Sequence, residues 1–215
     1  MQYNQLSRYI QEKYDIKSVI KSVIKYNKMA PEIPNFNKRS QILPTLSRLS
    51  PLLFLLGFVT YATIMQNLLS IYLLISFGLI SIANGFIKNG IIKPIFGVLG
   101  SRPTNANSCA LLLNGINDGT YGMPSGHSQI AWAVCTYLAL KVLLSHTDDT
   151  SRGSYYFKHM IKLLKVIAII SVAAYISYSR VTIEGCHTWM QVTVGGILGS
   201  VMGICVYSLE KLLFR

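Results

Sequence analysis

Residues 68–92 read LLSIYLLISFGLISIANGFIKNGII, a stretch in which Lys88 is the single charged residue. About 20 predominantly apolar residues are enough to cross the hydrocarbon core of a bilayer as a helix. Four further apolar runs follow the same pattern, at 51–66, 125–145, 160–178 and 188–209. Because all five runs are continuously apolar instead of alternating, we expect helices and not barrel strands. The sequence therefore predicts an all-α, polytopic membrane bundle of about five transmembrane helices.

The composition of the whole chain agrees with a membrane location. Of its 215 residues, 51% are hydrophobic and only 13% are charged, about half the charged share of an ordinary soluble domain. The formal net charge is nonetheless +12, from 20 Lys and Arg against 8 Asp and Glu. Such an excess indicates an anionic partner, which is nucleic acid, anionic lipid or a phosphorylated substrate.

The first 50 residues form a basic leader, with nine Lys and Arg and three Asp and Glu, half of the net charge. Residues 16–25, IKSVIKSVIK, predict a helix with an apolar face and a lysine stripe, suited to an anionic membrane surface or a protein partner. The repeat lacks arginine and aromatic residues, which disfavours nucleic acid. The segment 29–50 is expected to be a linker and not one continuous helix, because prolines interrupt or directly follow it: Pro31, Pro34, Pro44 and Pro51. We therefore divide the chain into a leader (1–50) and a membrane domain (51–215).

Residues suited to phosphate binding collect on one face of this predicted bundle. With five spans, the connections 93–124 and 179–187 lie on the same side of the membrane as the leader. At the ends of the apolar runs on that side lie Lys93, Arg102, the run YGMPSGHSQ (121–129), Ser179, Arg180 and His187. Anchoring of helix ends by snorkelling would explain each base taken alone. Two histidines, His127 and His187, each opening an apolar helix beside arginines, favour a chemical role instead.

The chemistry that this set can perform is phosphoryl transfer. Guanidinium groups offer forks of donors that match phosphate oxygens. The turn 124–127 enters a helix and presents backbone N–H groups to an anion, with the Ser125 hydroxyl as a further donor and Gly126 allowing close approach. One histidine can attack phosphorus while the other protonates the departing oxygen. The scheme requires no metal and no other cofactor.

Three sequence blocks resemble the signature of the type 2 phosphatidic acid phosphatase superfamily, whose helical membrane fold is shared with haloperoxidases: Lys93 with Arg102-Pro103, PSGH at 124–127, and Ser179-Arg180 with His187. The texts YGMPSGHSQ, SYSRV (177–181) and HTWMQV (187–192) are similar to its dolichyl diphosphatase branch, over roughly residues 48–205. The resemblance implies that His187 is the nucleophile and becomes a phosphohistidine, and that His127 is the acid. It implies phosphate binding by Lys93, Arg102, Ser125, Gly126 and Arg180.

Three positions depart from the superfamily pattern. Eight residues separate Lys93 from Arg102 instead of six. Six residues separate Arg180 from His187 instead of five, and they include Glu184, a carboxylate that would repel phosphate unless it is turned away or paired with a base. Gln191 stands where the superfamily commonly has an aspartate. Its side-chain carbonyl can accept the Nδ1 proton of the nucleophilic histidine but brings no charge, and we count Gln191 with the catalytic residues.

The cysteines and the late glycines receive structural interpretations. Cys109, Cys135, Cys186 and Cys205 show no metal-ligand spacing and are interpreted as buried small hydrophobic residues. Gly195, Gly196 and Gly199 are typical of a close-packing face on a membrane helix.

The sequence thus predicts a membrane enzyme that hydrolyses a polyprenyl diphosphate, dolichyl diphosphate first among them, to the monophosphate and inorganic phosphate without a metal. One alternative is a broader lipid phosphate phosphatase acting on phosphatidate or other isoprenoid phosphates. The other is a catalytically silent membrane protein that binds lipid head groups. The partners are a lipid and the membrane in each case, nucleic acid is excluded, and no protein partner is indicated.

The orientation of the site has two opposed predictions. The basic leader favours a cytosolic N-terminus, and five spans then put the site in the cytosol. The family resemblance implies an endoplasmic reticulum membrane protein with its site facing the lumen.

Overall fold

The computed structural model describes residues 39–103, 106, 109, 121–145 and 152–214, and every regular element in these ranges is helical. In chain order the α-helices are α3 (Arg39–Met65), α4 (Leu68–Phe86), α5 (Lys93–Phe96), α6 (Gly126–Leu143), α7 (Arg152–Tyr178) and α8 (Trp189–Leu213). The π-helical turns η1 (Ile87–Ile92) and η3 (Ser179–Ile183) prolong α4 and α7, and the 3-10 turn η2 (Gly97–Gly100) follows α5. The helix expected at 16–25 lies outside the described residues.

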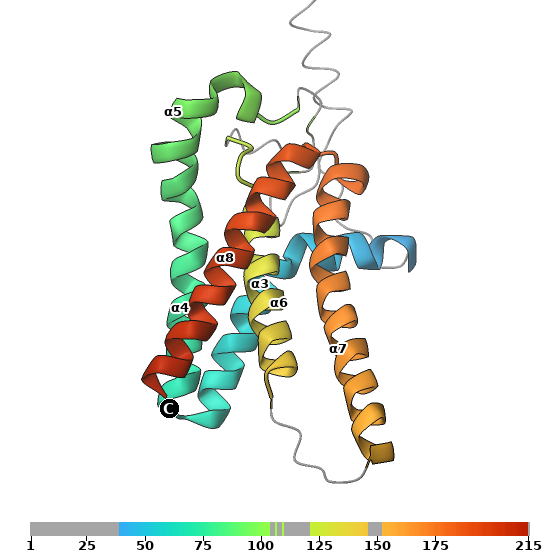
Figure 1. Ribbon diagram of the computed structural model, residues 1–215. Helices are drawn as coiled ribbons and strands as arrows, with labels where there is room; N and C mark the ends of the chain where they lie inside the picture. The colour runs from blue at the N-terminus through green and yellow to red at the C-terminus, as the bar shows by residue number, and fades with distance from the viewer. Residues whose placement is uncertain (1–38, 104–105, 107–108, 110–120, 146–151, 215) are drawn as a thin grey trace, which may run out of the picture.

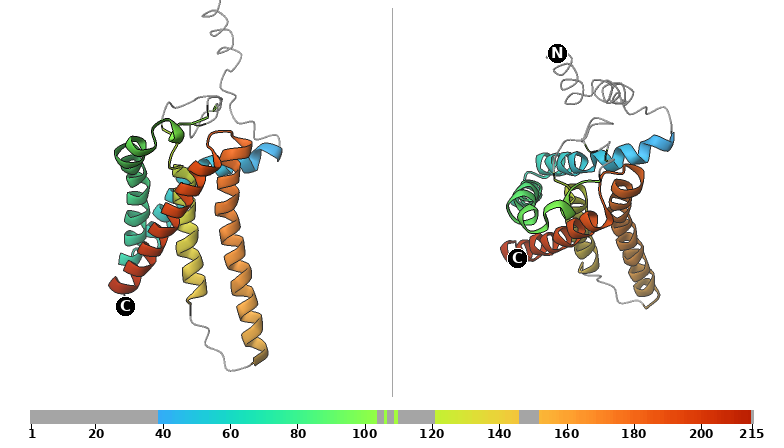
Figure 2. Two further views of the ribbon diagram at one scale, coloured as in Figure 1. Left: turned by 45° about the horizontal axis from the view of Figure 1, so that its top comes forward. Right: turned by 90° about the horizontal axis from the view of Figure 1, so that it is seen from above.

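Helix α6 is the centre of the bundle. It packs most extensively against α8 and α7 and also contacts α3 and α4, so that four helices surround it (Figures 1 and 2). Its buried Ile130 and Val134 share an apolar cluster with Phe77 of α4. The ring of Phe58 from α3 stacks on Phe77 at 4.5 Å between centroids. The helix that begins with the PSGH motif therefore packs against four other helices.

Glycines let α8 approach the backbone of α6. A Cβ atom on Gly195 would lie 2.6 Å from the carbonyl oxygen of Ser125, and one on Gly199 would lie 2.1 Å from that of Gln129. Gly203 meets the carbonyl of Ala133 in the same way. Small residues at a four-residue interval allow such contact between membrane helices, where van der Waals packing replaces the hydrophobic effect. The predicted close-packing face is thus present, and Gly196 faces the ring of Trp132 beside it.

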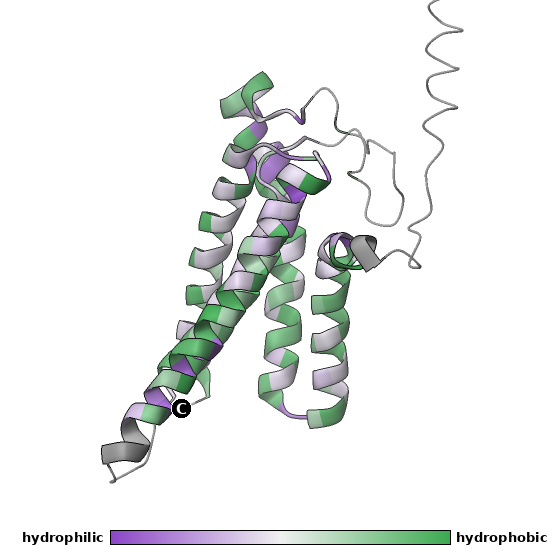
Figure 3. Cartoon of the chain, turned by 90° about the vertical axis from the view of Figure 1, so that its right-hand side faces the viewer, coloured by the Kyte–Doolittle hydropathy of each residue, from purple (hydrophilic) through white to green (hydrophobic). Residues whose placement is uncertain are grey.

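Four helical stretches are long and apolar enough to cross a membrane, namely Ile42–Met65, Leu68–Gly100, Tyr156–Ile183 and Trp189–Leu213. The fifth predicted span, 125–145, corresponds to α6, which is shorter and lies inside the other four. Figure 3 shows mainly hydrophobic residues along the helices and hydrophilic ones gathered where α6 and α8 begin. These findings confirm the prediction of a polytopic α-helical membrane bundle.

The prediction of a linker up to residue 50 is wrong for residues 39–50, which are helical. Pro44 and Pro51 both lie inside α3, which begins at Arg39 and passes through the boundary predicted at residue 50. In Figure 1 the first part of α3 lies across the bundle and the rest turns to run along it. A proline inside a helix removes one backbone hydrogen bond and bends the helix without necessarily ending it. The crosswise part brings Arg48, which is buried, over the end of the bundle where α6 begins.

Candidate functional site

Two helix N-termini meet at one end of the bundle. Ser125 caps α6, its hydroxyl accepting from the N–H of Ser128 at 3.5 Å. Thr188 caps α8 and forms a reciprocal capping box with Gln191. The Ser125 N–H donates to the carbonyl of Gln191 at 3.1 Å and ties the two caps together. The positive ends of two helix dipoles therefore face one region, which favours an anion there.

Gln191 fixes the ring of His187. The Nε2 of Gln191 donates to the carbonyl oxygens of Ser101 at 2.7 Å and Gly100 at 3.3 Å. Its Oε1 must then be the atom that lies 3.0 Å from His187 Nδ1, because a carbonyl group accepts and cannot donate. His187 consequently carries its proton on Nδ1 and keeps the Nε2 lone pair available. The expectation that a glutamine carbonyl accepts this proton agrees with the geometry.

His187 Nε2 faces a cation. An Nη1 hydrogen of Arg102 points to it at 3.4 Å, and the imidazole is 4% exposed. Burial, and then the charges of Arg180 and Arg102, hold the pKa of His187 well below its ordinary value of 6.5. The ring is therefore neutral at neutral pH, which is the form that can act as a nucleophile.

Arg180 is the most deeply buried charge of the site. Its side chain is fully enclosed, and its Nη1 pairs with Glu184. Among the residues that the structure describes, nothing accepts the hydrogen of its Nε. The backbone carbonyl of Arg180 accepts from the N–H groups of Cys186 and His187 at 3.0 and 3.2 Å. These two backbone hydrogen bonds thereby fix the position of His187 relative to Arg180 in the π-helical turn η3.

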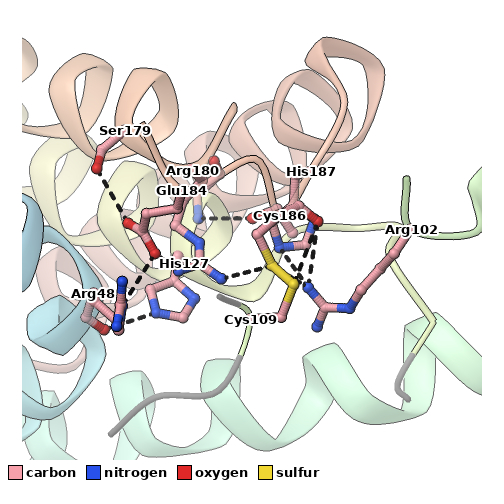
Figure 4. A network of polar contacts seen from close by, with 11 residues as sticks. Arg48, Arg102, Cys109, His127, Ser179, Arg180, Glu184, Cys186 and His187 are labelled. Carbon is pink, nitrogen blue, oxygen red and sulfur yellow. Dashed lines mark hydrogen bonds and ion pairs between the residues drawn. A yellow bond between two sulfur atoms is a disulfide. The ribbon is translucent and has the colours of Figure 1, made fainter. Parts of the chain in front are cut away.

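Glu184 does not stand against the phosphate site as an unpaired negative charge. Besides Arg180, its carboxylate accepts from Nε of Arg48 at 3.3 Å and from the Ser179 hydroxyl at 3.1 Å. Figure 4 shows the carboxylate between the two arginines, on the side away from Arg102. A buried carboxylate paired in this way offsets the cost of burying two guanidinium groups. Glu184 therefore orients arginines. It is paired with bases, which is one of the two arrangements expected from the sequence.

His127 lies opposite His187 at the first turn of α6. Its Nε2 is 2.8 Å from the carbonyl oxygen of Arg48, so Nε2 is protonated and donates, and Nδ1 is the nitrogen left for other chemistry. Figure 4 shows both rings near Arg180, whose charge acts on each of them. The PSGH turn and the last motif, 60 positions apart in the sequence, are thus brought to one site.

The structure does not bring Lys93 to this group. Lys93 is exposed at the start of α5, and no hydrogen bond or ion pair joins it to the site within the part of the chain that is described. Lys88, five residues earlier in η1, is partly buried and close enough to act electrostatically on His127. Sequence reasoning missed Lys88 although it is the single charge in 68–92. It also missed Arg48, which no sequence signal marks apart from its place before Pro51.

A disulfide joins Cys109 to Cys186, with the Cα atoms 5.3 Å apart. The interpretation of these two cysteines as plain buried hydrophobic residues is therefore wrong, because it considered spacing along the chain and not proximity of the two connections. Cys135 is buried and unpaired, as expected, whereas Cys205 is unpaired but exposed. Sγ of Cys186 accepts from Arg102 at 2.6 Å and from Arg180 at 3.2 Å, so the bridge lies between two site arginines.

The assembled site can bind a phosphoryl group and accept it covalently. Arg102 and Arg180 lie beside His187. Ser125 is fully buried and its N–H and hydroxyl are used in the two helix caps, whereas Gly126 lies at the start of α6 against Asn84. No cluster of three or more His, Cys, Asp and Glu side chains suited to a metal occurs among the described residues. The arrangement offers a neutral nucleophile, a second imidazole and several fixed donors, which are the parts that phosphoryl transfer through histidine needs.

Comparisons with known proteins show which proteins the chain is similar to. Residues 70–215 match the family model of the PAP2 superfamily. The chain is 34% identical over 176 residues to dolichyldiphosphatase 1 of Homo sapiens, covering 80% of this chain and 66% of the human protein. It is 32% identical over 183 residues to dolichyldiphosphatase 1 of Mus musculus, covering 84% and 68%. It is 35% identical over 122 residues to a dihydrosphingosine 1-phosphate phosphatase of Schizosaccharomyces pombe, covering 57% and 27%.

The chain spans about two thirds of the length of the dolichyldiphosphatases that it matches. No solved structure gives a significant match.

Proposed function

Because the chain belongs to the PAP2 superfamily, we propose that it is a membrane phosphatase that hydrolyses a polyprenyl diphosphate to the monophosphate and inorganic phosphate. The observation that carries the proposal is the state of His187. Its Nδ1–H donates to Oε1 of Gln191, and its Nε2 lone pair faces Arg102. A protein that only bound phosphate would need neither this tautomer nor a second histidine, which argues against a catalytically silent head-group binder.

In the first step, Nε2 of His187 attacks the terminal phosphorus. A P–N bond forms, the P–O bond to the bridging oxygen breaks, and the lipid monophosphate leaves with the Nδ1 proton of His127, which enters this step as an imidazolium with its Nε2–H on the carbonyl of Arg48. Arg102 and Arg180 offset the charge that spreads over the transferring oxygens, together with the N–H groups at the start of α6. Gln191 accepts from Nδ1 while the phosphorylated ring is positively charged.

In the second step, His127 takes a proton from water, and the hydroxide oxygen attacks the phosphohistidine. The P–N bond breaks, inorganic phosphate leaves, and His187 returns to its neutral form. His127 thus recovers the proton that it gave to the leaving group. Neither step passes through a metal ion.

The names of the relatives support a lipid diphosphate as the substrate, dolichyl diphosphate first among them. The dolichyldiphosphatases match 80% or more of the chain, whereas the sphingoid phosphatase matches 57%. A lipid diphosphate releases a monophosphate, which is a better leaving group than the alcohol that a monophosphate ester releases. This easier displacement suits a nucleophile supported by a neutral glutamine. The second candidate, a broader lipid phosphate phosphatase, is favoured by the shorter matches to the sphingoid phosphatase and to a putative phosphatidate phosphatase of Drosophila melanogaster.

For location we propose the endoplasmic reticulum membrane, with the site facing the lumen. The disulfide between Cys109 and Cys186 supports this orientation, because disulfides form and persist in oxidising compartments and are rare in the cytosol. The opposite orientation, favoured by the basic leader, would expose that bridge to a reducing compartment.

The test is phosphate release by the purified full chain, in chelator, from a polyprenyl diphosphate, the matching monophosphate and phosphatidate. We expect activity without divalent metal, a preference for the diphosphate, and a loss of at least ~10³-fold in His187→Ala. His159→Ala, at an exposed position of α7, is the matched control and keeps full activity. Equal rates on all three lipids would favour the broader phosphatase. Full activity of His187→Ala, or a strict metal requirement, would contradict the mechanism.

A further inference from the structure

A small pocket lies on the side of His127 that faces α3 and α4. Its volume is about 200 Å³, and its lining combines Asn84, His127 and Gln129 with apolar residues, Pro51, Ile80 and Ile130 among them. It is separate from the group formed by Arg102, Arg180 and His187, because none of those three residues lines it. Its polar and apolar sides together suit a group that joins a charged head to a hydrocarbon chain.

The direction of the displacement assigns this pocket to the leaving group. Attacking and leaving atoms lie roughly in line through phosphorus in a phosphoryl transfer. If His187 attacks and His127 protonates, the leaving oxygen and the lipid attached to it depart on the His127 side. The phosphate next to that oxygen then comes to the pocket beside His127.

The polar groups of the pocket are oriented by a chain of hydrogen bonds. Gln129 is fully buried, and its Nε2 donates to the carbonyl of Ile80 and to the sulfur of Met202 at 3.5 and 3.3 Å. Its Oε1 therefore accepts from Nδ2 of Asn84 at 2.7 Å. In the described part of the chain, no atom accepts the second hydrogen of this Asn84 nitrogen. The amide of Asn84 also lies against Gly126, where an added Cβ would approach its Oδ1 to 3.2 Å.

A positive charge lies about one helical turn beyond the pocket. Lys88 does not line the pocket itself but follows Asn84, which does, by four residues on the continuous α4–η1 helix, and it is near enough for its charge to act on His127. Arg180 and Arg48 already share Glu184, and Arg102 faces Nε2 of His187. A diphosphate brings a second charged phosphate, which needs a donor and a counter-charge of its own.

We propose that this pocket, here called the inner-phosphate pocket, binds the phosphate that stays on the lipid, with Asn84 as donor and Lys88 as counter-charge. The assignment rests on the proposed function and deepens it, because it makes Asn84 and Lys88 the residues that select diphosphates over monophosphates. The first isoprene unit then passes Pro51, Ile80 and Ile130 into the bilayer.

A larger apolar groove of about 490 Å³ lies between α7 and α8 and includes Trp132, Trp189 and Ile197 in its lining. Neither His127 nor His187 lines this groove, whereas His127 lines the inner-phosphate pocket. A leaving group that departs past His127 does not enter the groove, and filling the groove therefore provides a control.

The first measurement is the ratio of kcat/KM for a polyprenyl diphosphate to that for the monophosphate of the same chain length. Asn84→Asp keeps the shape of the side chain but sets a negative charge against the inner phosphate, and we expect the ratio to fall at least ~10-fold. Lys88→Met, at a partly exposed position, also lowers this ratio. Ile197→Trp, which fills the α7–α8 groove, leaves it unchanged.

The second measurement is inhibition by inorganic pyrophosphate and by inorganic phosphate. Asn84→Asp raises the inhibition constant of pyrophosphate, which reaches both phosphate positions, and leaves that of phosphate near the wild-type value. Equal losses on both substrates and both inhibitors would overturn the proposal and leave Asn84 a structural role. A lowered ratio in Ile197→Trp with an unchanged ratio in Asn84→Asp would overturn it in favour of the α7–α8 groove. A wild-type chain inactive on every lipid phosphate would remove the proposed function itself.

Discussion

At the scale of single residues, Gln191 shows how an amide can replace a carboxylate beside a nucleophilic histidine. Its two donors are used by the carbonyls of Gly100 and Ser101, which leaves its oxygen as the acceptor for His187. The tautomer is therefore set by hydrogen bonds alone, while the charges near the ring are positive. Those charges favour a neutral imidazole before substrate binds.

This electrostatic setting predicts a dependence on pH. Removing the charge in Arg102→Met raises the pKa of His187, so that more of the ring is protonated and inactive in acid. The ratio of kcat/KM of the wild type to kcat/KM of Arg102→Met is therefore larger at about pH 5.5 than at about pH 8. These two pH values lie on either side of the ordinary histidine pKa. Measured pH profiles with one substrate provide the check, because its own ionisation is common to both proteins.

The control for this profile is Lys165→Met, at an exposed position of α7, whose acid limb coincides with that of the wild type. An Arg102→Met profile that is lowered by the same factor at every pH would mean that the arginine binds phosphate without influencing the ionisation of His187.

Several site residues could be found from the sequence and several could not. Recognisable motifs at the ends of apolar runs contain four of them, His127, His187, Arg102 and Arg180. The structure brings these four together. Glu184 could be noticed but not assigned, because only the fold pairs it with Arg48, a residue 136 positions away. The disulfide could not be predicted either, since the pairing depends on which connections meet above the bundle.

At the scale of helices, the contact between α6 and α8 sets the relation of the two N-termini and hence of the two histidines. Sequence patterns predicted the apolar helices and the glycine face, because hydropathy and small residues report directly on a membrane environment. They did not predict the start of α3, since proline is read as a break although a long apolar helix tolerates it as a bend. They also gave no indication that α6 is the enclosed helix.

Gly199→Ala tests the contact between α6 and α8. The new methyl group meets the carbonyl of Gln129, so we expect a loss of stability on the order of 1–3 kcal/mol and reduced activity as the two N-termini separate. Thermal unfolding in detergent and phosphate release measure the two effects. Gly78→Ala in α4, where an added Cβ meets nothing within 4 Å, is the control. Equal unfolding temperatures for the two variants would contradict the packing account.

At the scale of the whole molecule, one end of the bundle carries the site and the disulfide, and the other carries the C-terminus (Figure 1). Charge counting and family resemblance oppose each other on which end faces the cytosol. The disulfide adds a chemical argument that charge counting lacks, and it favours an oxidising compartment for the site.

Labelling in sealed microsomes tests this orientation. In a Cys205→Ser background, Ser101→Cys places an exposed thiol just beyond the Leu68–Gly100 span at the site end, and Ser145→Cys places one at the opposite end. We expect an impermeant maleimide to label the Ser145→Cys chain in intact vesicles and the Ser101→Cys chain only after permeabilisation. The reverse pattern would place the site in the cytosol.

The central claim is that His187 carries the phosphoryl group, and rapid quenching with substrate labelled in the terminal phosphate tests it most directly. We predict an acid-labile, alkali-stable label on the peptide that contains His187, forming and decaying within one turnover and absent from His187→Ala. Rapid turnover without any phosphoenzyme, or a label on a different residue, would contradict the account.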